Sequence, residues 1–518
     1  MSGKLNYKKV LSVGLVFMFI TAFWYGYNSI VPKILTDKFG LSQFASGAIM
    51  ALDNVLAVFL LPVFGALSDK SKSRYGRRTP FIFWGTIISA LLLVAVSFAD
   101  VAQLQQLSDV LPTDSAAYEQ SLDTLWEANP SFDYNGTSAA LHEHVSEDTF
   151  KSIPMYRTDG KGNATGMVTD DYTALVVPAR QAYARQVSLA NPTYLILFVV
   201  ILLLLLVAMG TYRSPAVALM PDVTVKPLRS QGNAMINLMG SLGVLFVLVL
   251  GVILGTGRPA NVLMDYRLFF GVIAIYMVAA LVIFLLMVKE KKWCAEMEAD
   301  SGQLAGADVA HQEDEEASGS RKLTRGEKLS LFLILASVVL WYMGYNAMES
   351  KLSVYMSTEL GGIDYNIPYA IGGVMGILSY FPIGQLSAVW GRKKTIIAGV
   401  GIMAVAFGVM CFVTTATPVW VTYAVYAAVG ASWAAINVNS YPMVVELAKG
   451  SNVGKYTGFY YTASMSAQII TPLLSGALLT VDMRTLFPYA TVCIVLAFFT
   501  MLFVKHGDIQ TQKKKERV

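Results

Sequence analysis

The stretch Gly65-Ala66-Leu67-Ser68-Asp69-Lys70-Ser71-Lys72-Ser73-Arg74-Tyr75-Gly76-Arg77-Arg78 separates two apolar runs, residues 45–64 and 80–99. Five cations in nine residues cannot lie in hydrocarbon, so the stretch must be a tight charged turn between two membrane helices. Clustered Lys and Arg are retained on the cytoplasmic side of a membrane. The two glycines allow the turn to bend, and Asp69 can cap the following backbone or pair with a cation. The need to keep this loop on the cytoplasmic side would by itself explain the positive charges, but it would not explain the order of the residues.

The composition is that of a polytopic membrane protein. Of the 518 residues, 55% are hydrophobic and only 14% are charged, whereas roughly 25% of the residues of a soluble domain carry a charge. Apolar stretches of about 20 residues recur along the chain, enough to cross ~30 Å of hydrocarbon. The net charge of +4 arises from cations in short loops, so it does not indicate a nucleic-acid partner. The three cysteines are scattered and indicate neither a disulfide framework nor a metal site, and we expect no metal and no cofactor.

Counting the apolar runs predicts an all-α fold with twelve transmembrane helices. They cover approximately residues 10–35, 43–66, 79–99, 193–219, 232–256 and 268–288 in the first half, and 327–350, 366–389, 394–414, 418–445, 456–479 and 485–505 in the second. The first run has no small-residue cleavage site behind it, so we interpret it as a retained helix and not as a signal peptide. Every even-numbered connection is basic, which predicts a cell-membrane protein with both termini in the cytoplasm.

The third connection, residues 100–191, lies on the outer face in this topology and is acidic. It holds thirteen acidic residues against five basic ones, and either a small folded cap or a partly ordered loop would fit it. Its His142-Glu143-His144 could suggest a metal site, but a solvated loop is the favoured interpretation because no further ligand cluster is nearby. We interpret residues 289–326 as a cytoplasmic linker and residues 506–518 as a basic cytoplasmic tail.

An internal repeat relates the two halves of the chain. The tripeptide 26–28, Gly-Tyr-Asn, returns at 344–346, and the turn that begins at Gly65 returns in residues 384–394. Asp222 ends the fourth span as Glu446 ends the tenth, and the offset falls there from 319 to 224 residues. The difference is close to the length of the acidic segment, so that segment is an insertion into one copy of a duplicated six-helix unit. Residues 1–99 with 192–288 form the first pseudo-symmetric half and 327–505 the second, with a substrate site expected near the midplane between them.

Ionisable residues inside spans are costly and usually face a cavity. Asp53 lies twelve residues before Gly65, which places it about 18 Å of helix from the cytoplasmic end and close to mid-membrane. Arg213 lies roughly 13 Å from its own cytoplasmic end, and Glu349 stands toward the outer face. A membrane carboxylate that binds and releases a proton, beside an arginine that sets the preferred state, is what proton-coupled transport requires. We therefore name Asp53 and Glu349 as candidate proton-coupling residues.

Each of these residues also has a structural interpretation. Asp53 could form a hydrogen bond to a neighbouring helix, and Glu349 could be an outer-end acid that reaches water. Arg213 could extend its side chain to the cytoplasmic surface. These alternatives stay open at the level of the sequence.

Aromatic and amide side chains recur at related places in spans 1 and 7. Aromatic faces with amide and hydroxyl edges suit a sugar, because its C–H faces stack and its hydroxyls need hydrogen bonds. An aromatic belt at the membrane interface is the alternative, but it explains the repeated Gly-Tyr-Asn unit less well. The candidate substrate-binding residues are Trp24, Tyr27, Asn28, Arg213, Trp341, Tyr345, Asn346 and Asn437.

Charged residues at the cytoplasmic ends of the spans are candidates for ion pairs that close this side and break when it opens; a merely charged surface is the alternative. The second copy of the turn has Ala388 where the first has Asp69. We therefore expect the first copy to carry the gating contacts and the second to serve mainly topology. The candidate gate residues are Gly65, Asp69, Gly76, Arg77, Arg78, Asp222, Arg229, Gly391, Arg392 and Glu446.

The order Gly-x-Leu-Ser-Asp-Lys…Gly-Arg-Arg resembles the loop between helices 2 and 3 of the major facilitator superfamily. Continued into Thr79-Pro80-Phe81-Ile82, it resembles the glycoside–pentoside–hexuronide cation symporters, and within them the sucrose-transporter-like branch. Residues 213–222, with Arg229 and residues 232–234, are similar to the helix 4–5 region of that group. The resemblance covers essentially all the spans and leaves the acidic insertion outside it.

The resemblance implies proton-coupled uptake of a sugar or glycoside, and of a disaccharide in particular, by alternating access. In the sodium-using melibiose branch, helix 2 carries two acids one turn apart. Here Asp53 has Ala57 four residues on, which favours a proton over sodium. We expect a monomer in the lipid bilayer. A facilitator or exporter of another small solute and a transporter-derived membrane sensor are the alternatives. An enzyme is not expected, because no nucleophile–base pair or metal cluster occurs in the spans.

Overall fold

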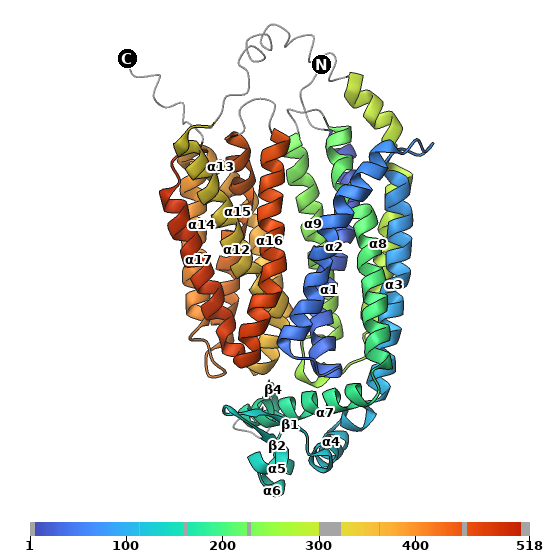
Figure 1. Ribbon diagram of the computed structural model, residues 1–518, viewed down its shortest axis with the longest axis vertical. Coiled ribbons are helices and arrows are strands. Elements are labelled where there is room, and N and C mark those ends of the chain that lie inside the picture. Colours follow the sequence, from blue (N-terminus) through green and yellow to red (C-terminus); the bar gives the residue numbers. More distant parts are fainter. Residues whose placement is uncertain are drawn as a thin grey trace.

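The computed structural model describes residues 6–112, 114–158, 164–224, 229–299, 323–361, 363–447 and 453–508. Within them, twelve helices of 18 residues or more run side by side (Figure 1). The first six are α1 (Tyr7–Lys33), α2 (Gln43–Lys70), α3 (Thr79–Gln105), α8 (Thr193–Val223), α9 (Arg229–Leu254) and α10 (Arg267–Met287). The second six are α12 (Arg325–Thr358), α13 (Asn366–Trp390), α14 (Arg392–Met410), α15 (Val419–Glu446), α16 (Val453–Val481) and α17 (Leu486–Phe503).

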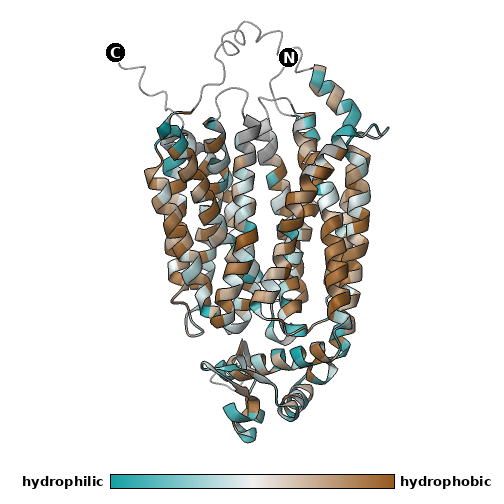
Figure 2. Ribbon diagram, viewed as in Figure 1, coloured by the Kyte–Doolittle hydropathy of each residue, from teal (hydrophilic) through white to brown (hydrophobic). Residues whose placement is uncertain are grey.

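These helices have the length and surface of membrane spans. Among the described residues, eleven helical segments are long and apolar enough to cross a membrane, and α13, with 25 residues, is the twelfth long helix. Large apolar side chains such as Ile253, Leu286 and Val405 are exposed on the outside of the bundle. Figure 2 shows apolar residues along the helices and polar residues at their ends. The prediction of a twelve-helix, all-α membrane fold is confirmed.

The two halves repeat one packing scheme. In the first half α1 packs on α9 and α10, and α3 packs on α8 and α10; in the second, α12 packs on α16 and α17, and α14 on α15 and α17. The repeated glycines share a packing role, because a Cβ at Gly26 would meet Ile273 of α10 and one at Gly344 would meet Ile494 of α17. Each half has its own apolar core. The repeat in the sequence therefore corresponds to two parallel six-helix units.

The insertion folds as a small cap at one end of the bundle (Figure 1). It begins after α3, which continues to Gln105, and comprises the 3₁₀ turn Ser108–Val110, α4 (Ser115–Ala128), β1 (Ser131–Tyr134), β2 (Thr137–Ala140), α5 (Leu141–His144), α6 (Glu147–Lys151), β3 (Tyr156–Thr158), β4 (Ala164–Val168), the π-helical turn Tyr172–Val176 and α7 (Val177–Ala190). Buried apolar residues from most of these elements form one core, joined by Val262 and Leu263 from the loop between α9 and α10. Of the two sequence interpretations, the folded cap is the one observed.

Two antiparallel hairpins stiffen the cap. Strands β1 and β2 pair in register from Ser131 opposite Ala140 to Tyr134 opposite Thr137. Asn135 and Gly136 connect them with φ angles of 51° and 78°, the left-handed conformation that a two-residue hairpin of this kind requires. In the His142-Glu143-His144 stretch, His142 and His144 each contact a backbone carbonyl, of Trp126 and Phe132 respectively. Among the described residues no group of three or more potential ligands gathers around a metal position.

The chain between the halves is described only in part. Residues 290–299 form a helix beside the first half, residues 300–322 lie outside the described residues, and α12 begins at Arg325 with the capping box of Thr324 and Glu327. The two basic turns, after α2 and before α14, lie at the end of the bundle opposite the cap (Figure 1). We call these two ends the turn end and the cap end.

A buried ion pair fixes the cap end of the first half. The Lys38 ammonium lies 2.7 Å from both carboxylate oxygens of Asp100, and both side chains are fully buried. Lys38 also donates to the Met264 carbonyl at 2.8 Å and lies over the Tyr266 ring. The pair joins the end of α1 to α3 and to the loop before α10.

Breaking this pair should destabilise the protein strongly. Asp100→Ala leaves the Lys38 charge buried without its partner, which costs about 3–5 kcal/mol, so we expect a lower thermal unfolding midpoint in detergent. The double variant Lys38→Met with Asp100→Leu removes both charges and should recover most of the loss. An unchanged midpoint for Asp100→Ala would show that the pair carries little stability.

Candidate functional site

A cavity of about 360 Å³ lies between the two halves, near the middle of the helices. Four helices of the second half contribute most of its lining, with α1 and α9 on the opposite side. Small residues on α13 and α15 make room for it, since Gly372, Gly376 and Gly430 all line the wall. The polar and aromatic residues of the lining are Tyr25, Ser241, Tyr342, Tyr345, Asn346, Glu349, Tyr369, Tyr380, Tyr426, Trp433 and Gln468.

A stacked aromatic pair forms one wall of the cavity. The rings of Tyr345 and Trp433 are parallel within 1°, with centroids 3.8 Å apart. Tyr342 meets the indole edge-on at 5.3 Å. Each ring limits the motion of the next, so the cavity has a rigid aromatic surface before any ligand arrives.

Polar groups converge on the same cavity. The Glu349 carboxylate forms no ion pair with any described residue, and the Tyr369 hydroxyl donates to the Glu349 backbone carbonyl at 2.6 Å. The side-chain nitrogen of Asn346 and the Tyr25 and Tyr426 hydroxyls are buried without a hydrogen-bond partner among the described atoms. Buried polar groups left without partners are costly, so their convergence on one cavity is typical of a site completed by a ligand.

Asp53 lies in a second cluster, inside the first half. The charge of Arg213 acts on its carboxylate, and the Arg213 guanidinium lies over the Trp24 ring at 5.2 Å. The Tyr27 hydroxyl is near enough to Asp53 to interact electrostatically and has no hydrogen-bond partner among the described atoms. The structure thus brings together four of the residues that the sequence singled out.

One contact joins the two clusters. The Asn54 side chain donates to Asp53 Oδ1 at 2.5 Å, and its nitrogen lies 3.5 Å from the backbone carbonyl of Gln468. Gln468 belongs to α16 and lines the cavity. The Asn54 side chain therefore links the surroundings of Asp53 to the second half.

Several predicted substrate residues lie away from the cavity. Trp341 is fully buried in the apolar core of the second half. Tyr27 and Trp24 pack against each other on α1, and Asn437 donates to the backbone carbonyl of Trp433; neither these three nor Asn28 belongs to the lining. Of the predicted substrate residues, Tyr345 and Asn346 line the cavity. Tyr369, Tyr380 and Trp433 also line it; they were not among the predicted ones, because no local sequence signal marks their helical faces.

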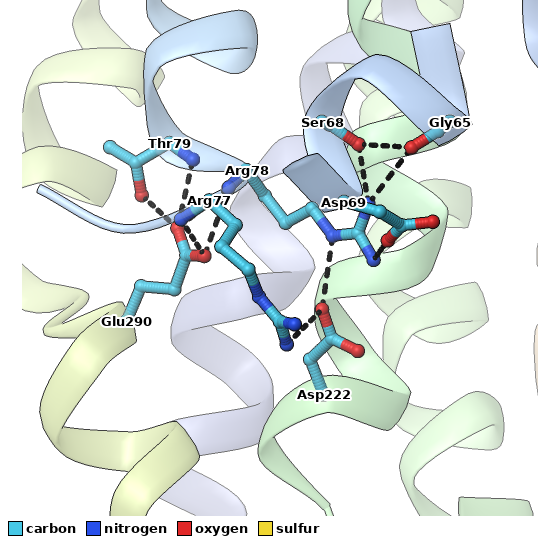
Figure 3. Close-up of polar contacts among 8 residues, drawn as sticks. All are labelled: Gly65, Ser68, Asp69, Arg77, Arg78, Thr79, Asp222 and Glu290. Atoms are coloured by element: carbon cyan, nitrogen blue, oxygen red, sulfur yellow. Dashed lines mark hydrogen bonds and ion pairs between the residues drawn. The ribbon is translucent and has the colours of Figure 1, made fainter. Parts of the chain in front are cut away.

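The first basic turn is organised by Arg78 (Figure 3). Its guanidinium lies 2.5 Å from an Asp69 oxygen and 3.0 Å from an Asp222 oxygen, and it also contacts the Ser68 hydroxyl. The side chain is almost fully buried. These contacts tie the end of α2 and the start of α3 to the end of α8. Gly65 allows α2 and α8 to approach, because a Cβ there would stand 2.8 Å from the Ser214 hydroxyl.

Glu290 binds the backbone of the same turn (Figure 3). Its carboxylate accepts hydrogen bonds from the backbone N–H groups of Arg77, Arg78 and Thr79 at 2.6–2.9 Å. Gly76 has φ +125°, and a Cβ there would overlap Glu290. The acid thus satisfies donors that the start of a helix leaves free. Glu290 lies far along the chain, and sequence analysis did not single it out.

The second turn repeats this arrangement with fewer contacts. Asp508 accepts from the Arg392 backbone N–H at 2.7 Å, and Gly391 has φ +92°. The Arg392 guanidinium lies 3.2 Å from Glu446, whose side chain is 55% exposed. In the described residues these ion pairs hold each turn within its own half, and the prediction that they close one side of the protein remains open. The side chain of Arg229, another predicted gate residue, lies outside the described atoms.

Among the described residues, several contacts between the halves lie toward the cap end. The Phe44 backbone N–H donates to the Thr480 hydroxyl at 3.1 Å, and the buried Lys351 ammonium contacts the Gln43 side chain at 3.2 Å. The Thr256 and Tyr365 hydroxyls are 3.1 Å apart. Toward the middle, the Tyr25 and Tyr369 rings meet edge-to-face at 5.5 Å. These contacts close the cavity on the cap side.

Comparison with known proteins identifies the fold family. The sequence pattern of the Major Facilitator Superfamily matches residues 181–387 and 334–518, together more than half of the chain. The chain belongs to the major facilitator superfamily. It is therefore a multi-pass membrane transporter and not an enzyme. A second pattern, that of MFS/sugar transport proteins, matches residues 12–104.

Individual major facilitator proteins resemble the chain in fold. The inward-open xylose transporter XylE from E. coli has 16% identity and a TM-score of 0.56, covering 98% of this chain and 97% of its own. The nucleoside transporter NupG has 13% identity and a TM-score of 0.52, covering 96% of this chain and 100% of its own. Since their substrates differ, the shared fold does not select a substrate.

A sequence relative matches a shorter stretch. A protein of Escherichia coli K12, named as a glycoside/cation symporter, YagG, is 32% identical over 77 residues. That stretch is 15% of this chain and 15% of the relative.

The two basic turns should respond differently to one conservative change. Arg78→Lys cannot keep the two-carboxylate contact of a guanidinium, so we expect faster tryptic cleavage within residues 70–77. Arg392→Lys alters a single, more exposed ion pair, which contributes about 0–1 kcal/mol, so cleavage within residues 391–394 should change little. Equal acceleration in both variants would contradict the special role of Arg78.

Proposed function

We propose that this major facilitator protein imports a sugar or glycoside, and a disaccharide in particular, by proton symport through alternating access. We place it in the cell membrane with the turn end and both termini cytoplasmic, since the basic turns lie there. The observation that carries the proposal is the cavity between the halves. It is lined by a stacked aromatic wall and by buried polar groups that have no hydrogen-bond partner among the described atoms.

The chemistry of the cavity favours a sugar. The Tyr345–Trp433 wall offers an apolar surface for C–H faces, while the Asn346 amide and the Glu349 carboxylate offer hydrogen-bond partners for hydroxyls. The volume of about 360 Å³ lies at the lower end of the range for small-molecule sites, as a compact carbohydrate requires. The local matches to MFS/sugar transport proteins and to a glycoside/cation symporter agree with this substrate class.

A proton is the coupling ion that the Asp53 cluster favours. Arg213 places a fixed positive charge beside the carboxylate, which opposes the binding of sodium at the same oxygens. Protonation of Asp53 would weaken its attraction to Arg213 and change the hydrogen bond from Asn54. The Asn54 side chain also contacts the backbone carbonyl of Gln468. The change in its hydrogen bond to Asp53 would therefore alter this contact between the halves. Glu349, inside the cavity, is the second proposed proton site.

Removing the Asp53 charge should uncouple transport from the proton gradient. In proteoliposomes with an imposed inward proton gradient, we expect the wild type to accumulate radiolabelled sucrose or maltose. Asp53→Asn should abolish this accumulation while retaining exchange of the sugar across the membrane at equal concentrations. Accumulation that survives in Asp53→Asn but disappears in Glu349→Gln would transfer the coupling role to Glu349. Flux of neither sugar would exclude these two substrates.

The aromatic wall should determine substrate affinity. Trp433→Ala removes a stacking surface worth about 0.5–1.5 kcal/mol, so we expect KM to rise roughly two- to ten-fold with a smaller effect on the maximal rate. Trp433→Phe keeps an aromatic face against Tyr345 and should recover part of the affinity. An unchanged KM for Trp433→Ala would place the substrate elsewhere.

A further inference from the structure

The cap is anchored to the first half. The Gln181 side chain on α7 donates to Asp37 at 2.8 Å, and the Gln103 side chain on α3 donates to the Ser188 hydroxyl on α7 at 3.2 Å. Gly40, with φ +64°, lets the chain after α1 lie directly against the α7 backbone, because a Cβ there would stand 2.3 Å from the Gln181 carbonyl. Together with the shared apolar core, these contacts make the cap a rigid extension of the first half.

Among the described residues, the cap's hydrogen bonds to the second half come from one short segment. The Val168 backbone N–H donates to the Gly361 carbonyl at 3.0 Å, in the loop between α12 and α13. The Thr415 hydroxyl, in the loop between α14 and α15, donates to Asp170 Oδ1 at 3.4 Å. The Met167 side chain lies against Gly361 as well. We call residues 167–170 the strap.

The cap holds the strap in place for these contacts. Arg157 on β3 donates from Nε to the Val168 carbonyl at 3.1 Å and from Nη2 to Asp170 at 2.7 Å. Val168 itself is fully buried in the core of the cap. The strap therefore presents a fixed backbone donor and a fixed carboxylate to the second half.

We propose that the strap is a latch that holds the extracytoplasmic ends of the two halves together and must release before the protein opens outward. The halves of such a transporter rock against each other around the substrate site. The cap moves with the first half because of its anchors, whereas Gly361 and Thr415 belong to the second. Outward opening separates these loops from the strap, along with the Phe44–Thr480 contact between α2 and α16. The inference rests on the movement of the halves and not on the identity of the substrate.

A pair of cysteines tests the latch directly. Asp170→Cys with Thr415→Cys joins the strap to the second half, and Gln181→Cys with Asp37→Cys joins the cap to the first half as a matched control. The background replaces the three native cysteines: Cys411 is exposed close to Thr415, and burial raises the pKa of the Cys294 thiol to about 11. In both pairs the side chains are in contact in this structure. A disulfide also needs Cβ atoms about 3.5–4.5 Å apart, so the loss of free thiols on oxidation is measured first for each pair.

The opening of the protein to the outside can be measured without a substrate, as the labelling rate of a single cysteine. A further change, Ser475→Cys, places a thiol at a buried position of α16, next to Gly476, which packs against Gln43 and Phe44 of α2. A membrane-impermeant maleimide reaches this thiol from outside when the contact opens, and labelling is followed on the peptide that contains residue 475. Oxidation of the strap pair should lower this labelling rate at least ten-fold, with recovery on reduction. Oxidation of the control pair should leave it unchanged. Equal labelling in the oxidised and reduced strap pair would overturn the proposal, even if the protein carried no sugar.

A variant that weakens the contact between the strap and the second half should raise the labelling rate. Thr415→Val removes the hydroxyl and keeps the shape, so labelling at position 475 should rise about two- to five-fold, as expected for one hydrogen bond. Thr414→Val, at the neighbouring exposed position, is its control and should have no effect. This pair keeps the test decisive if Asp37, which is buried, does not tolerate the cysteine of the control pair. A labelling rate that is unaffected by Thr415→Val and by strap oxidation would show that the cap is only a cover.

Discussion

Hydrocarbon tolerates few charges, and the cost of placing one there determines how the ionisable side chains of this bundle are arranged. Lys38 is neutralised by Asp100 at the cap end, Arg78 is held by two carboxylates at the turn end, and Asp53 stands beside Arg213 between them. Glu349 departs from this pattern, because no described cation pairs with it. It faces the cavity between the halves, which is where a transporter can use an uncompensated carboxylate.

Much of the fold could be predicted from the sequence, because the membrane imposes the length of each helix and the basic turns impose its direction. The internal repeat in the sequence then predicted two similar halves, and in the structure their helices pack in equivalent pairs. The site was harder to predict. The repeat relates Tyr27 to Tyr345 by position, but it does not give the rotation of each helix about its axis. In the structure Tyr345 lines the cavity, whereas Tyr25 and not Tyr27 does so from α1.

Contacts between residues far apart in the chain account for the rest. Glu290 and Asp508 each follow the last helix of a half and bind the backbone before its third helix, and nothing local in the sequence marks them for this role. Trp433 likewise lines the cavity while it stacks on Tyr345 of another helix, and this contact has no local sequence signal. The cap is different, because Asn135-Gly136 is a strong local signal for a hairpin. That signal, unlike the acidic charge, favours a folded cap over a loop.

The two clusters at the centre of the protein lie in different halves. Asp53 and Arg213, which interact electrostatically, belong to the first half. Tyr345, Asn346, Glu349 and Trp433 belong to the second. On the proposed assignment, the source of energy and most of the selectivity are encoded in separate stretches of the gene. Related chains could then diverge in what they carry through changes in one half, while the ion that drives uptake is inherited unchanged with the other.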